Sequence, residues 1–207
     1  MNTDIKTTYP RTKGISLAAL FAALLSIASV VSIPMPFVPV PVTLQVLVVF
    51  LILCLLGPFY GALSCSVYLL LGTAGIPVFA GATAGPGIVI GPLGGYLLSF
   101  PIAVFLGGLV SGPRPRTKRE DAIRLSLAVS VALATVYLIG AAWLGLSLRL
   151  DMTEAFALGA APFIPIDATK ALVAIPFALR LRWTGTYYLP VHSAKARQGD
   201  TEVHSGT

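Results

Sequence analysis

Long runs of apolar residues, separated by short polar or proline- and glycine-rich breaks, dominate the chain. A helix that crosses a bilayer needs roughly 20 apolar residues. The hydropathy pattern predicts such helices at residues 15–33, 43–57, 59–73, 92–110, 123–148 and 162–181. The pattern therefore predicts an all-α, polytopic membrane protein with about six transmembrane helices in one bundle.

Two of the breaks are themselves apolar. Residues 34–42 have the sequence PMPFVPVPV, whose prolines remove backbone donors and favour extended structure, so we expect a stiff loop. Residues 74–91 have the sequence AGIPVFAGATAGPGIVIG. Irregular backbone at membrane depth is tolerated only where protein or a cavity covers it. We therefore expect both segments to be ordered extracellular loops, the second folded over the bundle.

Composition argues against an ordinary soluble domain. Charged residues make up 11% of the chain, compared with roughly 25% in soluble domains, and the mean hydropathy is +0.88. Residues 14–113 include no Asp, Glu, Lys or Arg. The net charge of +6 comes from the tails and one loop, without interleaved aromatic residues. Membrane topology explains that distribution, and nucleic acid is not an expected partner.

The basic residues also predict an orientation. With an even number of spans, both tails and the loop after the fourth predicted helix lie on one side, and that side carries Lys6, Arg11, Lys13, Arg114, Arg116, Lys118, Arg119, Arg124, Arg180, Arg182, Lys195 and Arg197. The other side has Arg149 with Asp151 and Glu154. The positive-inside rule then predicts a multi-pass cell membrane protein with both termini in the cytoplasm.

Three regions follow from this organisation. Residues 1–14 form a cytoplasmic tail, 15–182 the membrane domain, and 183–207 a second cytoplasmic tail that is polar and expected to be disordered. The first apolar run follows basic residues as a signal peptide does, but further spans follow it. We expect an uncleaved first helix.

Asp167 and Lys170 are the conspicuous ionisable residues inside the predicted spans. Each costs roughly 2.5 to 3.5 kcal/mol at a helix centre, and their i, i+3 spacing places both on one helix face. Either they neutralise each other at a helix interface, or they also bind a ligand. Intramembrane charges more often mark a functional site.

Other polar groups are expected at the same depth, since a helix rises about 1.5 Å per residue. Thr43 and Gln45 begin the second predicted helix, Tyr96 lies one turn into the fourth, and Trp143 is near the outer end of the fifth. These groups indicate a pocket open to the outside. Thr43 and Gln45 could instead satisfy helix-start amides, and Tyr96 and Trp143 could belong to an interfacial aromatic belt.

The first predicted helix carries small residues at i+4 intervals, namely Gly14, Ala18, Ala22 and Ser26, with Ala19 and Ala23 beside them. Small residues at this spacing allow helices to approach closely. The stripe could serve internal packing or contact with a partner helix.

Several kinds of site lack a sequence signature. Cys54 and Cys65 lie in apolar runs and indicate neither a disulfide framework nor a metal site. There is no P-loop, no H-E-x-x-H and no G-x-S-x-G motif. Binding is therefore favoured over catalysis, and neither a cofactor nor a metal is expected.

Four motifs occur together in order: PxPFxPVPVTLQ at 34–45, GxxGxPVFAG at 72–81, GPxGGYLxSF at 91–100 and PFIPxDxxK at 162–170. The chain, from about residue 15 to residue 182, thereby resembles the BioY family, the biotin-specific substrate-binding subunits of energy-coupling factor (ECF) transporters. The resemblance implies a six-helix fold that captures biotin from outside and assembles with a membrane coupling subunit and two cytoplasmic ATPase subunits. ATP hydrolysis is then expected on the partners, so the chain itself is not an enzyme.

The resemblance also implies roles for particular residues. Asp167 and Lys170 would contact biotin, and the alanine stripe with Ala18, Ala22 and Ala23 would face the coupling subunit. The other expected substrate-binding residues are Tyr96, Gln45 and Thr43, which lie at the same depth, and Phe79, because the apolar segment 78–87 can enclose the rings. Asp167 can accept a hydrogen bond from a ureido N–H while Lys170 donates to a ligand oxygen, either the ureido oxygen or the carboxylate. The sequence departs from the family pattern at Leu93, where a hydroxyl residue is expected, and at Gly81–Ala82, where relatives can offer an amide.

Three alternatives remain at this point. The chain could be a solitary biotin transporter or a subunit for another small vitamin. It could be a membrane enzyme that uses Asp167 and Lys170, although the missing catalytic motifs argue against this. It could also be a purely structural membrane partner, which the pocket-like layer of polar groups disfavours.

Overall fold

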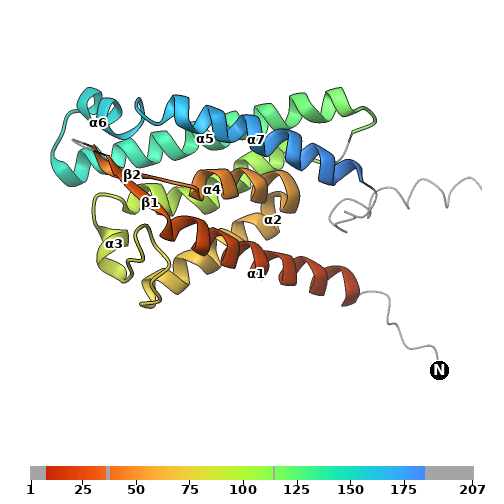
Figure 1. Cartoon of the computed structure of the whole chain (residues 1–207), viewed down its shortest axis with the longest axis horizontal. Helices are drawn as coiled ribbons and strands as arrows, with labels where there is room; N and C mark the ends of the chain where they lie inside the picture. The colour runs from red at the N-terminus through yellow and green to blue at the C-terminus, as the bar shows by residue number, and fades with distance from the viewer. Residues whose placement is uncertain (1–7, 36–37, 114, 185–207) are drawn as a thin grey trace, which may run out of the picture.

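The computed structural model describes residues 8–35, 38–113 and 115–184, which form a helical bundle with one β-hairpin (Figure 1). In chain order the elements are α1 (Thr8–Val30), β1 (Ser32–Met35), β2 (Val38–Thr43), α2 (Gln45–Thr73), α3 (Pro86–Ile90), α4 (Gly94–Ser111), α5 (Lys118–Leu148), α6 (Met152–Gly159) and α7 (Ile164–Trp183). The hairpin, α3 and α6 lie at one end of the bundle, and α5 begins and α7 ends at the other.

Helix α2 is a helical hairpin with two arms. Gly57 interrupts it with φ 71° and ψ −169°, and Pro58 has no N–H to continue the helical ladder. The Gln45 Nε2 to Tyr68 Oη distance is 2.7 Å, although residues so far apart along a straight helix would be separated by about 34 Å. The two arms therefore lie side by side, as the reversal of the ribbon in Figure 1 shows.

The spans agree with the pattern of apolar runs. Helices α1, α2, α4 and α5 are each long and apolar enough to cross a membrane, and α6 with α7, bent by 48°, forms a further segment. With each arm of α2 counted as one segment, the described residues have about six membrane segments, as predicted. The prediction of a helical membrane bundle is confirmed. The helices predicted at 43–57 and 59–73 are the two arms of α2.

The proline-rich segment is extended, as predicted, but it is also paired. Strands β1 and β2 are antiparallel, with Ser32 opposite Thr43 and Ile33 opposite Val42. A lone two-stranded hairpin is only marginally stable in water, and here β2 also contacts α6 and α1. The hairpin therefore adds a small sheet to an otherwise helical fold.

Residues 74–91 fold over the bundle around Phe79. The side chain of Phe79 is fully buried and packs edge-to-face on Tyr68, with ring centroids 5.5 Å apart. Ser29 on α1 donates a hydrogen bond to the carbonyl of Val78, and the Phe79 N–H donates to the Thr83 carbonyl at 2.9 Å. The segment is thus ordered, and α3 gives part of it a helical turn.

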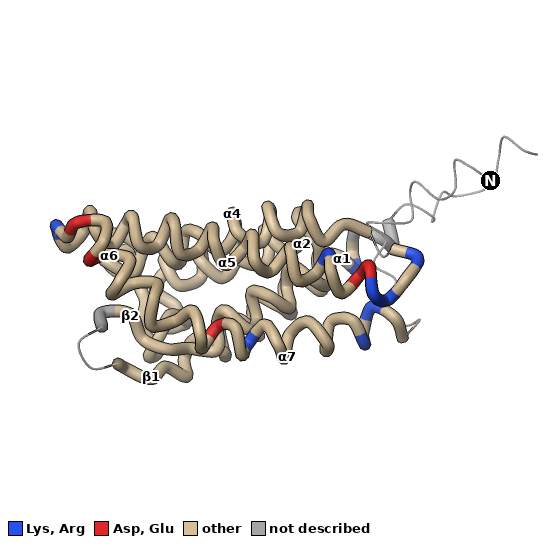
Figure 2. The backbone as a smooth tube through the Cα atoms, turned by 90° about the horizontal axis from the view of Figure 1, so that it is seen from above, with Lys and Arg blue, Asp and Glu red and all other residues tan. Residues whose placement is uncertain are grey.

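Charged residues gather at the two ends of the bundle, apart from one pair between them (Figure 2). Lys118 begins α5, and Arg180 and Arg182 lie in the last turn of α7, at one end. Arg149 follows α5, and Asp151 precedes α6, at the other. Of the basic residues on which the orientation rests, Lys6, Arg114, Lys195 and Arg197 lie outside the described residues, as does most of the 183–207 tail.

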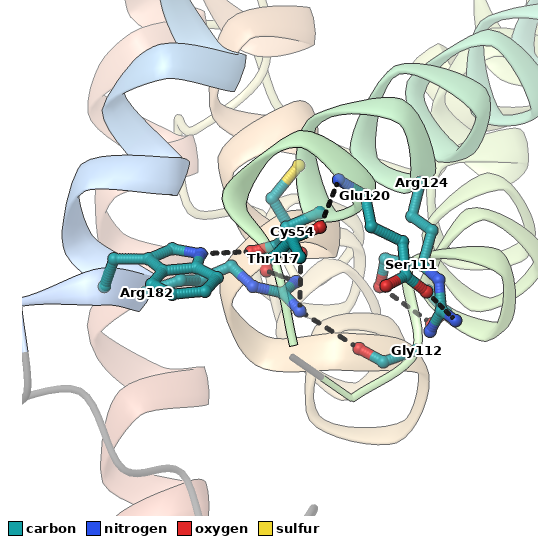
Figure 3. Close-up of polar contacts among 10 residues, drawn as sticks. Cys54, Ser111, Gly112, Thr117, Glu120, Arg124 and Arg182 are labelled. Carbon is teal, nitrogen blue, oxygen red and sulfur yellow. Dashed lines mark hydrogen bonds and ion pairs between the residues drawn. The ribbon is translucent and has the colours of Figure 1, made fainter. Parts of the chain in front are cut away.

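A buried ion pair closes the more basic end (Figure 3). Arg182 lies 3.2 Å from Asp121, which is fully buried, and Trp183 donates to the same carboxylate at 2.9 Å. Arg182 also donates to the Cys54 carbonyl at 3.0 Å. Four residues on from Cys54 is Pro58, which has no N–H, so the guanidinium supplies the donor that the helix lacks. The end of α7 is thereby fastened to the turn of α2 and the start of α5.

Candidate ligand site

A cavity opens beneath β2, between α2, α4, α5 and α7. It is partly open to solvent. Its lining is mainly apolar, with polar groups converging from several elements. The residues that line it are Val40, Pro41, Val42, Thr43, Gln45, Val46, Tyr96, Phe100, Val136, Tyr137, Gly159, Phe163, Asp167 and Lys170.

Asp167 and Lys170 form an ion pair in this wall. Lys170 Nζ lies 2.6 Å from Asp167 Oδ1, and their side chains are 11% and 4% exposed, respectively. Tyr137 on α5 donates to the other carboxylate oxygen, Oδ2, at 2.8 Å. Asp167 also lies in the first turn of α7, where the positive end of the helix dipole favours a negative charge. The carboxylate is thus stabilised by two side-chain donors and by the helix start.

Gln45 is held by a chain of hydrogen bonds across the two arms of α2. The Thr43 hydroxyl donates to Gln45 Oε1 at 2.9 Å, and Gln45 Nε2 donates to the Tyr68 hydroxyl at 2.7 Å. The Gln45 N–H also donates to Thr43 Oγ1 at 3.3 Å. Thr43 therefore does support the helix start, but it also orients a side chain that lines the cavity.

Tyr96 is fitted tightly into the wall of the same cavity. Its hydroxyl donates to the Gly159 carbonyl at 2.8 Å, and a Cβ atom at Gly140 would lie 2.2 Å from its ring. The residue is 8% exposed, so its ring faces the protein interior. Trp143 has a different role: its Nε1 donates to the Gly91 carbonyl at 2.9 Å, which fastens the end of α3 to α5.

A second lobe adjoins the first. The two lobes share Val40, Pro41, Gln45, Tyr96 and Phe100. The walls that belong to the second lobe alone are largely apolar, and they comprise Phe79, Ala80, Thr83, Ile88, Leu93 and Leu97. The site thus combines a polar lobe at Asp167 with an apolar lobe at Phe79.

The structure brings the predicted candidates to one place. Thr43, Gln45, Tyr96, Asp167 and Lys170 line the polar lobe, and Phe79 lines the apolar one. Sequence reasoning missed two tyrosines, namely Tyr137, which binds Asp167, and Tyr68, which binds Gln45.

The small residues of α1 divide between two faces. Ala18 and Ala22 are each 1% exposed, so they pack inside this chain, as the internal alternative for the stripe predicts. Gly14 belongs to the same inner face, because a Cβ there would collide with the ring of Tyr60. Ala23 is exposed, so of the three predicted partner contacts it is the one that another helix can reach.

The sequence of this chain is similar to those of known biotin transporters. A model of the BioY family matches residues 1–186. The probable biotin transporter BioY of Pyrococcus horikoshii is 42% identical over 172 residues, which cover 83% of this chain and 98% of that protein. The biotin transporter BioY of Thermotoga maritima is 38% identical over 166 residues, covering 80% of this chain and 93% of that protein.

A solved structure has the same fold. It is a crystal structure of the S-component for biotin from an ECF-type ABC transporter. It superposes with a TM-score of 0.76 at 28% sequence identity, and the match covers 87% of this chain and 96% of that one.

Proposed function

The chain belongs to the BioY family, and we propose on this premise that it is the biotin-binding subunit of a vitamin uptake transporter. It is a multi-pass membrane protein of a transporter family and not of an enzyme family. Its ligand is biotin, which it captures from outside the cell for import.

The arrangement at Asp167 is the observation that carries this proposal. A ureido group presents N–H donors and a carbonyl acceptor side by side. Asp167 offers carboxylate oxygens and Lys170 offers an ammonium group, 2.6 Å apart and directed into the same lobe. Charge-assisted hydrogen bonds of this kind are stronger than neutral ones. The apolar walls around Tyr96, Phe100 and Phe79 suit the fused rings of the ligand.

Binding of labelled biotin to the purified protein tests the proposal directly. Riboflavin and thiamine, added in excess as competitors, are the controls for specificity. We expect saturable binding that unlabelled biotin competes away and the other two vitamins do not. Binding that either control displaces would assign the chain to another vitamin.

The remaining parts of the proposal concern orientation and partners. Both termini lie in the cytoplasm, and a membrane coupling subunit with two cytoplasmic ATPase subunits drives import. The exposed face of α1 around Ala19 and Ala23 is the proposed contact with the coupling subunit, since small side chains there permit close helix packing. The basic end of the bundle supports the orientation.

The names of the relatives leave a second arrangement to test. The curated relatives are called biotin transporters, whereas the solved structure is a component of a larger transporter. Biotin uptake by cells that express the chain with and without the coupling and ATPase subunits separates the two. We expect uptake to depend on the partners, and uptake of equal rate without them would establish a solitary transporter.

A further inference from the structure

A ligand that binds both Asp167 and Lys170 disturbs the ion pair between them. Lys170 Nζ donates to Asp167 Oδ1 at 2.6 Å. If Lys170 turns toward a ligand oxygen, Asp167 loses its charged partner. A buried carboxylate without donors is strongly destabilised, so until ligand N–H groups reach Asp167 it depends on another donor from the protein.

Tyr137 meets this need. Its hydroxyl donates to Asp167 Oδ2 at 2.8 Å, whereas Lys170 approaches Oδ1, so the two donors do not compete. Tyr137 is 8% exposed and comes from α5, a different helix from the pair. Its position is therefore independent of any movement of the lysine along α7.

The same contact also sets the direction of the carboxylate. Asp167 is 3% exposed and lies in the first turn of α7, where its side chain could rotate about its bond to the backbone. A hydrogen bond from a neighbouring helix removes that freedom. The remaining acceptor capacity of the carboxylate is then available to ligand N–H groups in the polar lobe.

We propose that Tyr137 is a positioning residue of the ligand site: it holds Asp167 in its ligand-facing orientation and keeps the carboxylate hydrogen-bonded when Lys170 turns to the ligand. The proposal rests on the proposed function for the identity of the ligand. The role of Tyr137 toward Asp167 can be tested with and without biotin.

The first test measures biotin affinity in a double-mutant cycle. Tyr137→Phe keeps the ring and removes only the hydroxyl, and we expect it to weaken biotin binding about tenfold to a hundredfold. In an Asp167→Asn background the same change should cost less than about threefold, because residues that act through one another are not additive. Tyr96→Phe is the matched control. Its hydroxyl binds the Gly159 carbonyl instead, so its effect should be additive with Asp167→Asn.

The second test needs no ligand, so it separates failure of this inference from failure of the proposed function. In apo protein, Tyr137→Phe should lower the melting temperature more in a Lys170→Met background than in wild type, since Asp167 then has neither donor. Adding Asp167→Asn should restore folding if that variant unfolds. Equal losses in both backgrounds, or an affinity effect of Tyr137→Phe that is unchanged by Asp167→Asn, would overturn the proposal.

Discussion

Asp167 and Lys170 either contact biotin or only neutralise each other, and the two interpretations predict different biotin affinities for a double variant. Replacing both together, Asp167→Asn with Lys170→Met, removes two buried charges at once and leaves neither stranded. If they contact biotin, the folded double variant should bind about tenfold to a hundredfold more weakly, which corresponds to one charge-assisted hydrogen bond. Biotin affinity measured on monodisperse protein decides this. If the double variant binds biotin with wild-type affinity, Asp167 and Lys170 only neutralise each other and do not contact the ligand.

Glycines around Tyr96 give a second test at this scale. A Cβ at Gly140 would lie 2.2 Å from the Tyr96 ring, so Gly140→Ala must push that ring toward the cavity that it lines. We expect the variant to lose biotin affinity by at least about tenfold, on the scale where 1.4 kcal/mol is tenfold. Gly87→Ala is the control, because nothing lies within 4 Å of its Cβ position. Equal affinities in the two variants would show that the Tyr96 ring does not shape the site.

Three of the residues predicted from the sequence share one property. Asp167, Lys170 and Gln45 are polar side chains in apolar helices, so their cost alone singles them out. Tyr137 is not found in this way, because the number of residues from the end of its helix places it deeper in the membrane than Asp167. Asp167, in the first turn of α7, accepts a hydrogen bond from Tyr137, so this turn lies level with the middle of α5 instead of with its end at Leu148. Depth alone could not reveal that offset.

Among the elements, α2 shows what hydropathy can and cannot predict. The Gly-Pro break between two apolar runs indicates two helices, and the structure has two arms. The Cys54 carbonyl before the turn accepts a hydrogen bond from Arg182, a residue far along the chain. Before folding, that residue is indistinguishable from the other basic residues near the end of the membrane domain. The pairing of β1 with β2 is similarly hidden, since prolines favour extension without specifying a partner.

We therefore expect Arg182→Met to destabilise the fold. The change removes the donor to the Cys54 carbonyl and leaves Asp121 buried without its charged partner, which typically costs about 3 to 5 kcal/mol. Thermal unfolding of the purified protein measures the loss. Adding Asp121→Asn should recover part of it. The matched control is Arg180→Met, which removes the same charge from an exposed position on the same helix and should leave the melting temperature nearly unchanged.

The two faces of α1 predict opposite consequences for the same substitution. Ala23→Leu adds bulk to the exposed face, so we expect weaker assembly with the coupling subunit while biotin binding stays intact. Ala18→Leu adds bulk to the packed interior and should instead lower the thermal stability of the isolated chain, by about 1 to 3 kcal/mol. Co-purification with the partner and thermal unfolding, measured on both variants, distinguish these outcomes. Unchanged co-purification of the Ala23 variant would remove α1 from the proposed contact.

For the whole molecule, some properties can be predicted from the sequence, whereas others exist only in the folded structure. The membrane class, the number of spans and the separation of charges follow from local composition, so they are predictable residue by residue. The cavity does not, because its walls come from β2, α2, α4, α5 and α7. It exists only once the arms of α2 have folded back and the hairpin covers them.

The orientation of the bundle follows from its charges and can be tested on intact cells. Arg116 is an exposed residue at the basic end, and Thr153 is exposed on α6 at the other end. The native cysteines are both buried, so single cysteines at these positions can be compared in a background from which they have been removed. A membrane-impermeant maleimide should label Thr153→Cys in intact cells and should label Arg116→Cys only after permeabilisation, since basic loops are retained in the cytoplasm. Labelling at position 116 from outside, with position 153 protected, would contradict this orientation. The opposite orientation would place the opening of the polar lobe toward the cytoplasm.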